Sequence, residues 1–332
     1  MRLENFLALT QTTLINEPCI NSFENIVFEA SRIKRGDLFF AYNTQDISLA
    51  VANGAYCVVF EKLTPEIRDN EIAWVYTESL DDTLKRLLRF RMIEKESIAY
   101  ECNEIILKLS LQTITESNFI ALSGDLKSVF KSLWDIQNRT TVLFCPALSD
   151  KEIFTAVKKI PDISSQTIEI IEQTLFETSF IYDNTFYERQ LISPFFIPYL
   201  EKLLHFYKTL KIKYKLKKFT PIEHFEAVFT NTKFEIKSFG SSDKVLIFEP
   251  NITLIDSQMM FLQRHASWGK IIFIIPSSII KEENENIFSY HNEKDIINIL
   301  KNNHFHFALI VGVDKSILNK PLSNQTQLTL NF

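Results

Sequence analysis

Short apolar runs alternate with amphipathic segments along the chain, and this alternation predicts an α/β fold. In residues 1–95, the apolar runs have strand length and two further segments place apolar residues at helical spacing. Strands are expected at 26–28, 38–42 and 56–60, and helices at 46–53 and 80–93. Gly54 is expected just past the first helix, where a glycine commonly ends a helix. Residues 1–95 are therefore predicted to form a small α/β domain.

The same alternation continues in two further parts of the chain. In residues 105–240, strands are expected at 118–123 and 141–145 and helices at 127–137 and 195–210. In residues 241–332, strands are expected at 245–248, 270–275 and 307–311 and helices at 257–265 and 293–301. The polar and charged stretch 94–103 is interpreted as a linker. The pattern predicts three α/β domains.

Composition narrows the class of protein. The chain has 332 residues, 46% of them hydrophobic and 23% charged, which is typical of a folded protein with more than one domain. A net charge of −5 does not indicate the basic surface that a nucleic-acid-binding protein needs. The apolar runs are too short to span a membrane and the N-terminus lacks a signal-peptide pattern, so a cytoplasmic protein without a membrane span is expected.

Lysines recur at nearly every second position between residues 211 and 218, namely Lys211, Lys213, Lys215, Lys217 and Lys218. This spacing favours one solvated face of a strand, with an anion or partner patch as the alternative. His304 and His306 are interpreted as surface histidines or as core histidines with satisfied hydrogen bonds, and a pair of metal ligands is the alternative. The four cysteines lack zinc spacing, and a catalytic role for Cys145 is not favoured.

Glycine is scarce, with six residues in the whole chain. Phosphate-binding loops need glycine because the backbone must approach the ligand closely, often with positive φ. The composition therefore argues against a nucleotide-dependent enzyme. Phenylalanine is abundant, with 29 residues, and the phenylalanines in 176–187 and 195–207 are interpreted mainly as core, with an aromatic docking surface as the alternative.

Residues 28–41 resemble the opening domain of the Mur ligases of peptidoglycan synthesis. They contain Ser31-Arg32, a short spacer, Gly36-Asp37 and then Leu-Phe-Phe-Ala, which is similar to that family's Asp-Ser-Arg…Pro-Gly-Asp-Leu-Phe pattern. The segment 50–59, with Gly54, is similar to its Ala-x-x-x-Gly-Ala-x-Ala-Val-Val segment. The resemblance implies that this domain binds a UDP-muramoyl precursor through Ser31, Arg32, Gly36, Asp37 and Gly54, although Ala30 stands where the family has Asp.

The third domain is similar to the same family, and within it to the ligase that adds D-alanyl-D-alanine. Residues 246–257 align without gaps on that ligase's Asp-Asp-Ser-Tyr-Asn-Ala-Asn-Pro-x-Ser motif, and Gly269-Lys270 and Gly312 fit two later strands. Most residues of the motif are replaced, and Val311 and Asp314 stand at the family's late Lys and Arg. The resemblance implies the scaffold of this domain without its chemistry.

The nucleotide loop decides what the resemblance implies for activity. The family has Thr-Gly-Thr-Asn-Gly-Lys-Thr-Thr after a strand, whereas this chain has Ser123-Gly124-Asp125-Leu126-Lys127-Ser128. Ala121 replaces the first glycine, one residue is deleted, and Asp125 puts a negative charge where phosphates would bind. The sequence is identified as a degenerate nucleotide loop with Ser123, Gly124, Lys127 and Ser128 as its remnants.

These features predict a three-domain Mur-ligase-like architecture with a truncated central ATPase-like domain. The leading hypothesis is a bacterial, non-catalytic Mur-ligase-like protein of cytoplasmic peptidoglycan precursor synthesis, which binds a UDP-muramoyl peptide precursor or another cell-wall protein. No catalytic residue, metal site or cofactor is predicted, and ATP and Mg²⁺ are expected only if the nucleotide site functions. The alternatives are an active ATP-dependent amide ligase with a divergent nucleotide site and a purely structural interaction module.

Overall fold

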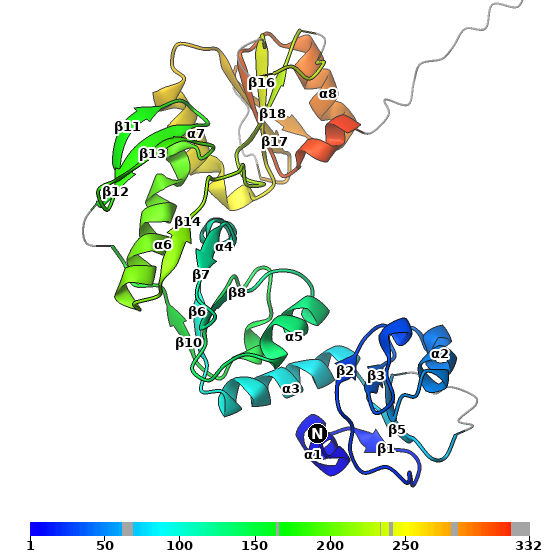
Figure 1. The fold of residues 1–332 in the computed structure, drawn as a ribbon. Helices are drawn as coiled ribbons and strands as arrows, with labels where there is room; N and C mark the ends of the chain where they lie inside the picture. Colours follow the sequence, from blue (N-terminus) through cyan, green and yellow to red (C-terminus); the bar gives the residue numbers. More distant parts are fainter. Residues whose placement is uncertain (62–68, 164–165, 233, 239–241, 280–284, 320–332) are drawn as a thin grey trace, which may run out of the picture. The chain divides into compact units, whose positions relative to one another are not determined.

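The computed structural model describes residues 1–61, 69–163, 166–232, 234–238, 242–279 and 285–319 (Figure 1). The chain divides into two compact units. Unit 1 comprises Met1–Leu111, Thr115–Pro161 and Tyr207–Tyr214, and unit 2 comprises Gln112–Ile114, Asp162–Phe206 and Lys215–Phe332. The predicted boundary between residues 240 and 241 lies outside the described residues. The division into three domains stays a prediction.

Unit 1 begins with a five-stranded sheet in the order β1-β5-β4-β3-β2. Strands β2 to β5 are parallel, and β1 is antiparallel to β5. The strand bounds are Thr13–Leu14 (β1), Ile26–Val27 (β2), Leu38–Phe40 (β3), Cys57–Phe60 (β4) and Ala73–Tyr76 (β5). Helix α2 (Ile47–Ala52) packs on one face, where it shares a core with Phe39 and Val58. Both faces of the sheet are thus buried, which suits its continuous apolar strands.

A second sheet in unit 1 has four parallel strands in the order β10-β6-β9-β8. Its strands are Ile98–Glu101 (β6), Phe119–Ala121 (β8), Thr141–Phe144 (β9) and Val157–Lys159 (β10), with helices Glu104–Leu111 (α4) and Leu126–Trp134 (α5) between them. The predicted linker over residues 94–103 is wrong, because β6 lies inside this sheet. Ala99 and Tyr100 are buried there, and the polar residues on either side of the strand obscured it in the sequence.

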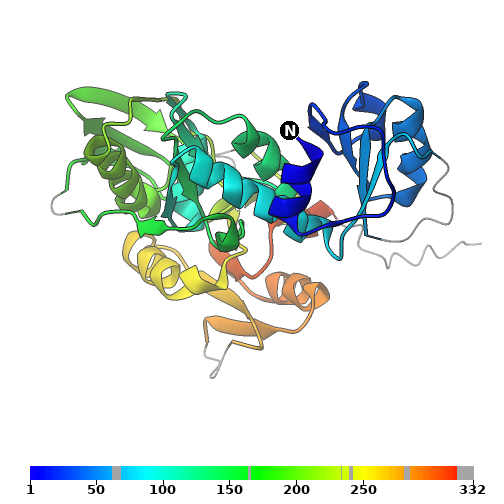
Figure 2. The ribbon, with the colours of Figure 1, turned by 90° about the horizontal axis from the view of Figure 1, so that it is seen from below.

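Helix α3 (Leu80–Glu94) connects the two sheets of unit 1 through one shared core. Its Leu84, Leu87 and Leu88 are fully buried, and the same cluster contains Phe40 of the first sheet and Phe144 of the second. Helix α1 (Leu3–Thr10) packs beside α3 (Figure 2). Ser79 caps the start of α3, where Asp81 and Asp82 add favourable charge to the first turn, as expected from the sequence. Unit 1 is therefore a single packing unit.

Unit 2 contains a three-stranded antiparallel sheet and a five-stranded, mainly parallel sheet. The first consists of Glu169–Gln173 (β11), Thr178–Tyr182 (β12) and Thr185–Gln190 (β13), none of which was predicted. The second has the order β15-β16-β19-β17-β18, with β15 antiparallel to β16. Its strands are Glu226–Thr230 (β15), Lys244–Glu249 (β16), Ile271–Pro276 (β17), Ile287–Tyr290 (β18) and Phe307–Val311 (β19).

In unit 2, helix α7 (Ile255–His265) lies between β16 and β17 in the chain, and helix α8 (Glu293–Asn302) lies between β18 and β19. The chain passes between the units within β7 (Thr113–Thr115), α6 (Ile197–Thr209) and β14 (Tyr214–Leu216). The α/β class is confirmed. Nearly all the strands and helices predicted from the sequence are present within a few residues of their expected ends, although Pro194–Phe196 forms a 3-10 turn before α6.

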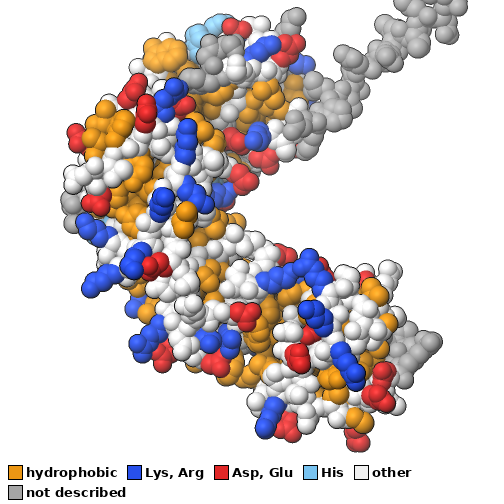
Figure 3. All heavy atoms as spheres, viewed as in Figure 1, with side chains coloured by type: hydrophobic (Ala, Val, Ile, Leu, Met, Phe, Trp, Pro, Cys, Tyr) orange, Lys and Arg blue, Asp and Glu red, His pale blue; other side chains and the backbone are white. Residues whose placement is uncertain are grey.

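Basic and acidic side chains are interspersed on the face in Figure 3. The lysines between residues 211 and 218 are exposed while Ile212 and Leu216 between them are buried, which confirms that they are solvated. Only Lys215 lies within a strand, β14, so they do not form one strand face. Within the described residues, no helix is both long and apolar enough to cross a membrane.

Candidate functional site

Three of the five predicted precursor-binding residues hold the turn before β3. Asp37 is 2% exposed, and its two carboxylate oxygens accept hydrogen bonds from Asn25 Nδ2 at 2.8 Å and from the Lys34 backbone N–H at 2.9 Å. Its carboxylate is thus satisfied from within the fold, as a buried charge must be. Gly36 (φ +102°) donates its N–H to the Gly54 carbonyl at 3.1 Å. These residues serve the fold of the turn.

Both the backbone conformation at residue 54 and the lack of space for a side chain there require glycine. Its φ is +97°, and a Cβ at this position would lie 3.1 Å from Arg35 Cα. A side chain here would strain the backbone and push the β3 turn away from the end of α2. The predicted C′ glycine is therefore confirmed, with a packing role added.

The other two predicted residues, Ser31 and Arg32, are exposed on the 3-10 turn η1 (Ala30–Arg32). Arg32 Nε lies 2.7 Å from Glu29 Oε2, and its side chain is 70% exposed. Lys34 and Arg35 are also exposed. Three cations within four residues can attract an anion such as a phosphate group. We refer to Arg32, Lys34 and Arg35 as the basic rim.

The predicted degenerate nucleotide loop lies between β8 and α5. Gly124 has φ +94°, and Asp125 is the N-cap of α5. One oxygen of Asp125, Oδ1, accepts hydrogen bonds from the Ser128 backbone N–H at 3.0 Å and from Ser128 Oγ at 2.5 Å. These bonds hold the pKa of the Asp125 carboxyl below its usual range. The N-terminus of a helix attracts anions, and here the chain's own carboxylate occupies that position.

Lys127, predicted as the remnant of a phosphate-binding lysine, contacts an aromatic ring. Its Nζ lies 3.8 Å from the centroid of the Tyr42 ring, a cation–π contact. Tyr42 Oη donates a hydrogen bond to Asp81 Oδ1 at 2.7 Å, and burial, followed by that bond, raises the tyrosine pKa. One turn further along α5, Lys131 Nζ lies 3.4 Å from Glu29 Oε1. The lysines on α5 thus connect this helix to the segment that follows β3 and to the residue that precedes η1.

A buried acid–base pair in unit 2 was missed by sequence reasoning. His224 Nδ1 and Glu249 Oε1 are 2.7 Å apart, and both side chains have no exposed surface. Glu249 also accepts hydrogen bonds from the backbone N–H groups of Phe225 at 3.1 Å and Asn251 at 2.9 Å, and from Gln258 Nε2. The only signal in the sequence was a glutamate that ends an apolar run. The pair lacks access to a substrate, so we assign it a structural role.

The histidine and cysteine candidates from the sequence gain no support as metal ligands or as a reactive thiol in the described part of the chain. The rings of His304 and His306 are exposed and 5.5 Å apart, and among the described residues no three His, Cys, Asp or Glu side chains gather where they could hold a metal ion. Burial raises the pKa of the Cys145 thiol, which disfavours the reactive thiolate. Of the phenylalanines in residues 176–187, Phe180 is buried, as predicted for a core residue, and Phe186 is 54% exposed. An aromatic docking surface stays a prediction.

The architecture, α/β units with several parallel sheets, is that of the Mur ligases. No family model and no curated protein matches the sequence. Solved structures do match the fold. A crystal structure of MurF from Acinetobacter baumannii is similar with a TM-score of 0.54 and 10% identity, over 93% of this chain and 95% of that one. MurF ligase from Thermotoga maritima, solved in complex with ADP, gives a TM-score of 0.50 and 10% identity, over 89% and 95%. The resemblance inferred from the sequence is confirmed for the fold.

Proposed function

We propose that this chain is a non-catalytic, Mur-ligase-like protein of bacterial peptidoglycan precursor synthesis in the cytoplasm. It binds a UDP-muramoyl precursor without consuming ATP. One observation carries the non-catalytic part of the proposal: the Asp125 carboxylate caps α5 and accepts the Ser128 backbone N–H at the helix end where a nucleotide phosphate would bind. Lys127 supports it, because its ammonium group lies over the Tyr42 ring.

An ATP-dependent ligase must stabilise the negative charge of the transferred phosphoryl group. At the start of α5, the Ser128 N–H, the Ser128 hydroxyl and the Lys127 ammonium group already have partners within the chain, and a triphosphate would also face the charge of Asp125. Binding ATP would require these contacts to break. The proposed protein therefore needs neither ATP nor Mg²⁺ as a cofactor.

The proposed precursor contact is the basic rim next to Ser31. A UDP-muramoyl peptide carries a pyrophosphate, and guanidinium groups bind phosphate oxygens through paired N–H donors. Arg35 is pre-oriented, because its Nε donates a hydrogen bond to Tyr56 Oη at 3.2 Å. Gly36, Asp37 and Gly54 support this surface indirectly by fixing the turn that carries it.

Thermal-shift titration tests the proposal, because a ligand that binds only the native state raises the melting temperature. We expect UDP-muramoyl peptide to raise it and ATP with Mg²⁺ to leave it unchanged. The double variant Arg32→Gln, Arg35→Gln should lose the shift, whereas Arg89→Gln, an exposed arginine on α3, should keep it.

Two other results would each replace the proposal. A shift with ATP and Mg²⁺ that disappears in Lys127→Ala would indicate an active ligase with a rebuilt nucleotide site. No shift with either ligand would indicate a purely structural interaction module, in which the basic rim has no precursor to bind.

A further inference from the structure

Two cysteines lie next to each other at the ends of neighbouring strands in the second sheet of unit 1. Strands β6 and β9 are parallel, and their last residues, Glu101 and Phe144, are partners in register. Cys102 and Cys145 follow directly. The Cys102 backbone N–H donates to the Phe144 carbonyl at 2.9 Å, which continues the ladder by one bond. The two cysteines are therefore partners across the sheet.

The two thiols lie on the same face of this sheet. Ala99 and Phe144 belong to the core shared with α3, and alternation along each strand places Cys102 and Cys145 on the opposite face. Cys102 Sγ donates a weak hydrogen bond to the Phe144 carbonyl at 3.4 Å, directly before Cys145. Burial, followed by the electrostatic effect of Cys145, raises the pKa of the Cys102 thiol, which agrees with this proximity.

The spacing of the backbone allows a disulfide between these cysteines. Neighbouring strands lie about 4.8 Å apart, and the Cα atoms of bridged cysteines are usually about 4.4–6.8 Å apart. On one side of the pair, Asn103 Oδ1 accepts the Ile106 N–H at 2.9 Å at the start of α4. On the other side, the Leu148 and Ser149 N–H groups each donate to the Cys145 carbonyl at 2.9 Å. The fold thus holds the backbone of both cysteines where a bridge can form.

The two thiols differ in their access to solvent. Cys102 is half-buried, whereas Cys145 is 4% exposed. Burial raises the pKa of both thiols, so little thiolate is present at neutral pH and the pair reacts slowly. A small oxidant is therefore expected to react first at Cys102, with Cys145 as the thiol that resolves the product.

We propose that Cys102 and Cys145 form a redox modification site, at which a peroxide converts the two thiols into a reversible intramolecular disulfide. The Cys102 thiolate attacks one peroxide oxygen, the O–O bond breaks, and a sulfenic acid and hydroxide form. The Cys145 sulfur then attacks the Cys102 sulfur, and the hydroxyl group leaves as water with the proton of the second thiol. Two thiols and one hydrogen peroxide thus give one disulfide and two waters. A small thiol reductant restores the pair.

Peroxide treatment of the full chain carrying Cys19→Ser tests this inference. The substitution is needed because Cys19 is exposed and can bridge two copies of the chain. After the reaction, free thiols are blocked in urea and linked peptides are identified by mass spectrometry. We expect Cys102 and Cys145 to form a linked peptide that disappears on reduction. Cys57 is fully buried and should keep its thiol, so it is the internal control.

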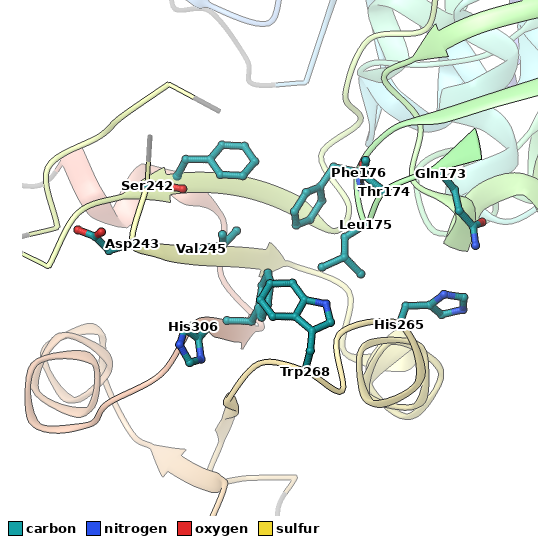
Figure 4. Close-up of a pocket in the computed structure, with 12 residues that line it drawn as sticks. Gln173, Thr174, Leu175, Phe176, Ser242, Asp243, Val245, His265, Trp268 and His306 are labelled. Atoms are coloured by element: carbon teal, nitrogen blue, oxygen red, sulfur yellow. Dashed lines mark hydrogen bonds between the residues drawn. The ribbon is translucent and has the colours of Figure 1, made fainter. Parts of the chain in front are cut away.

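Side reactions of peroxide are recognised by their mass. Met260 is 50% exposed, and Trp268, which lines the cavity of unit 2 shown in Figure 4, is 74% exposed. Oxygenation of either side chain adds about 16 Da and links no peptides, whereas the disulfide removes about 2 Da through the loss of two hydrogen atoms.

Two controls test whether the fold brings the thiols together. In Cys102→Ser, the Cys145 thiol should be lost at least about tenfold more slowly, because it no longer has an intramolecular partner. In the urea-unfolded chain, the linkages should include Cys57. An arsenical that bridges two neighbouring thiols, phenylarsine oxide, gives a readout without a variant at the pair, and it should protect Cys102 and Cys145 together from alkylation.

The inference would be overturned by loss of both thiols without a linked peptide, or by linkage of either cysteine to Cys57 in the folded chain. Unchanged loss of the Cys145 thiol in Cys102→Ser, or failure of the arsenical to protect the pair, would also overturn it. So would survival of both thiols at a peroxide concentration that oxygenates Met260.

Discussion

At the residue scale, Asp125 and Lys127 show how the end of a helix that could bind phosphate can be satisfied from within the chain. Asp125 accepts the Ser128 N–H, and Lys127 contacts Tyr42. A helix N-terminus favours a negative charge, and a lysine favours a partner for its ammonium group. Asp125 and Tyr42 fulfil these two preferences, which a bound phosphate would otherwise fulfil. Both side chains thus have partners within the chain, as the proposed function requires.

Replacement of Asp125 by alanine should lower the melting temperature of the protein, because α5 loses its N-cap. Asp135→Ala, at the other end of the same helix, is the matched control. A carboxylate near a helix C-terminus is unfavourable, so this variant should have an unchanged or slightly higher melting temperature. Differential scanning calorimetry measures both, and equal effects of the two variants would contradict the assigned cap.

The pH dependence of stability provides a second test of this carboxylate. Its folded-state pKa is depressed, so its stabilising contribution is present above the unfolded-state pKa and is lost as the pH falls through the lower folded-state pKa. Asp125→Asn retains a capping acceptor but does not titrate there. Between neutral pH and pH 3, its unfolding free energy should therefore fall less than that of the wild type. Parallel curves in urea denaturation would show that the cap does not depend on charge.

At the element scale, α3 joins the two sheets of unit 1. Its buried leucines belong to the same core as Phe40 of the first sheet and Phe144 of the second. A helix in this position couples the folding of both sheets, because loss of its packing exposes apolar side chains on each. Strand β6 follows the end of α3 closely in the sequence, so there is no room for a flexible linker between them.

Leu88→Ala should lower the unfolding free energy by about 2–5 kcal/mol, because it leaves a cavity in this shared core. Ile93→Ala is the control on the same helix, where the side chain is 56% exposed, and its effect should be much smaller. Equilibrium urea unfolding gives both values. A small effect of Leu88→Ala, similar to that of Ile93→Ala, would show that α3 does not carry the core of unit 1.

At the scale of the whole molecule, the sequence predicted the parallel sheets better than the antiparallel one. Strands such as β4 and β19 are buried on both faces and appear as continuous apolar runs. Strand β11 is exposed at every position and β13 at most positions, so neither shows the apolar pattern of a buried strand. Strand β6 was hidden by its charged neighbours.

The motifs indicated where a site would lie, which stays a prediction, but the contacts that hold these residues could not be read from the sequence. The motifs identified Ser31, Arg32 and the α5 loop, yet the internal roles of Gly36, Asp37 and Gly54 depend on contacts that bring Asn25 and Arg35 to them. The contact of Lys127 with Tyr42 and the pair of His224 with Glu249 join residues distant in the chain. Spacing along a sequence does not report such contacts.

The most direct test of the account is whether the purified chain binds and turns over ATP in the presence of Mg²⁺. The account predicts no ATP hydrolysis above the buffer rate, with or without UDP-muramoyl peptide, and no ATP binding that depends on Lys127. Turnover by the wild type that disappears in Lys127→Ala would contradict it, because the α5 loop would then be a working nucleotide site.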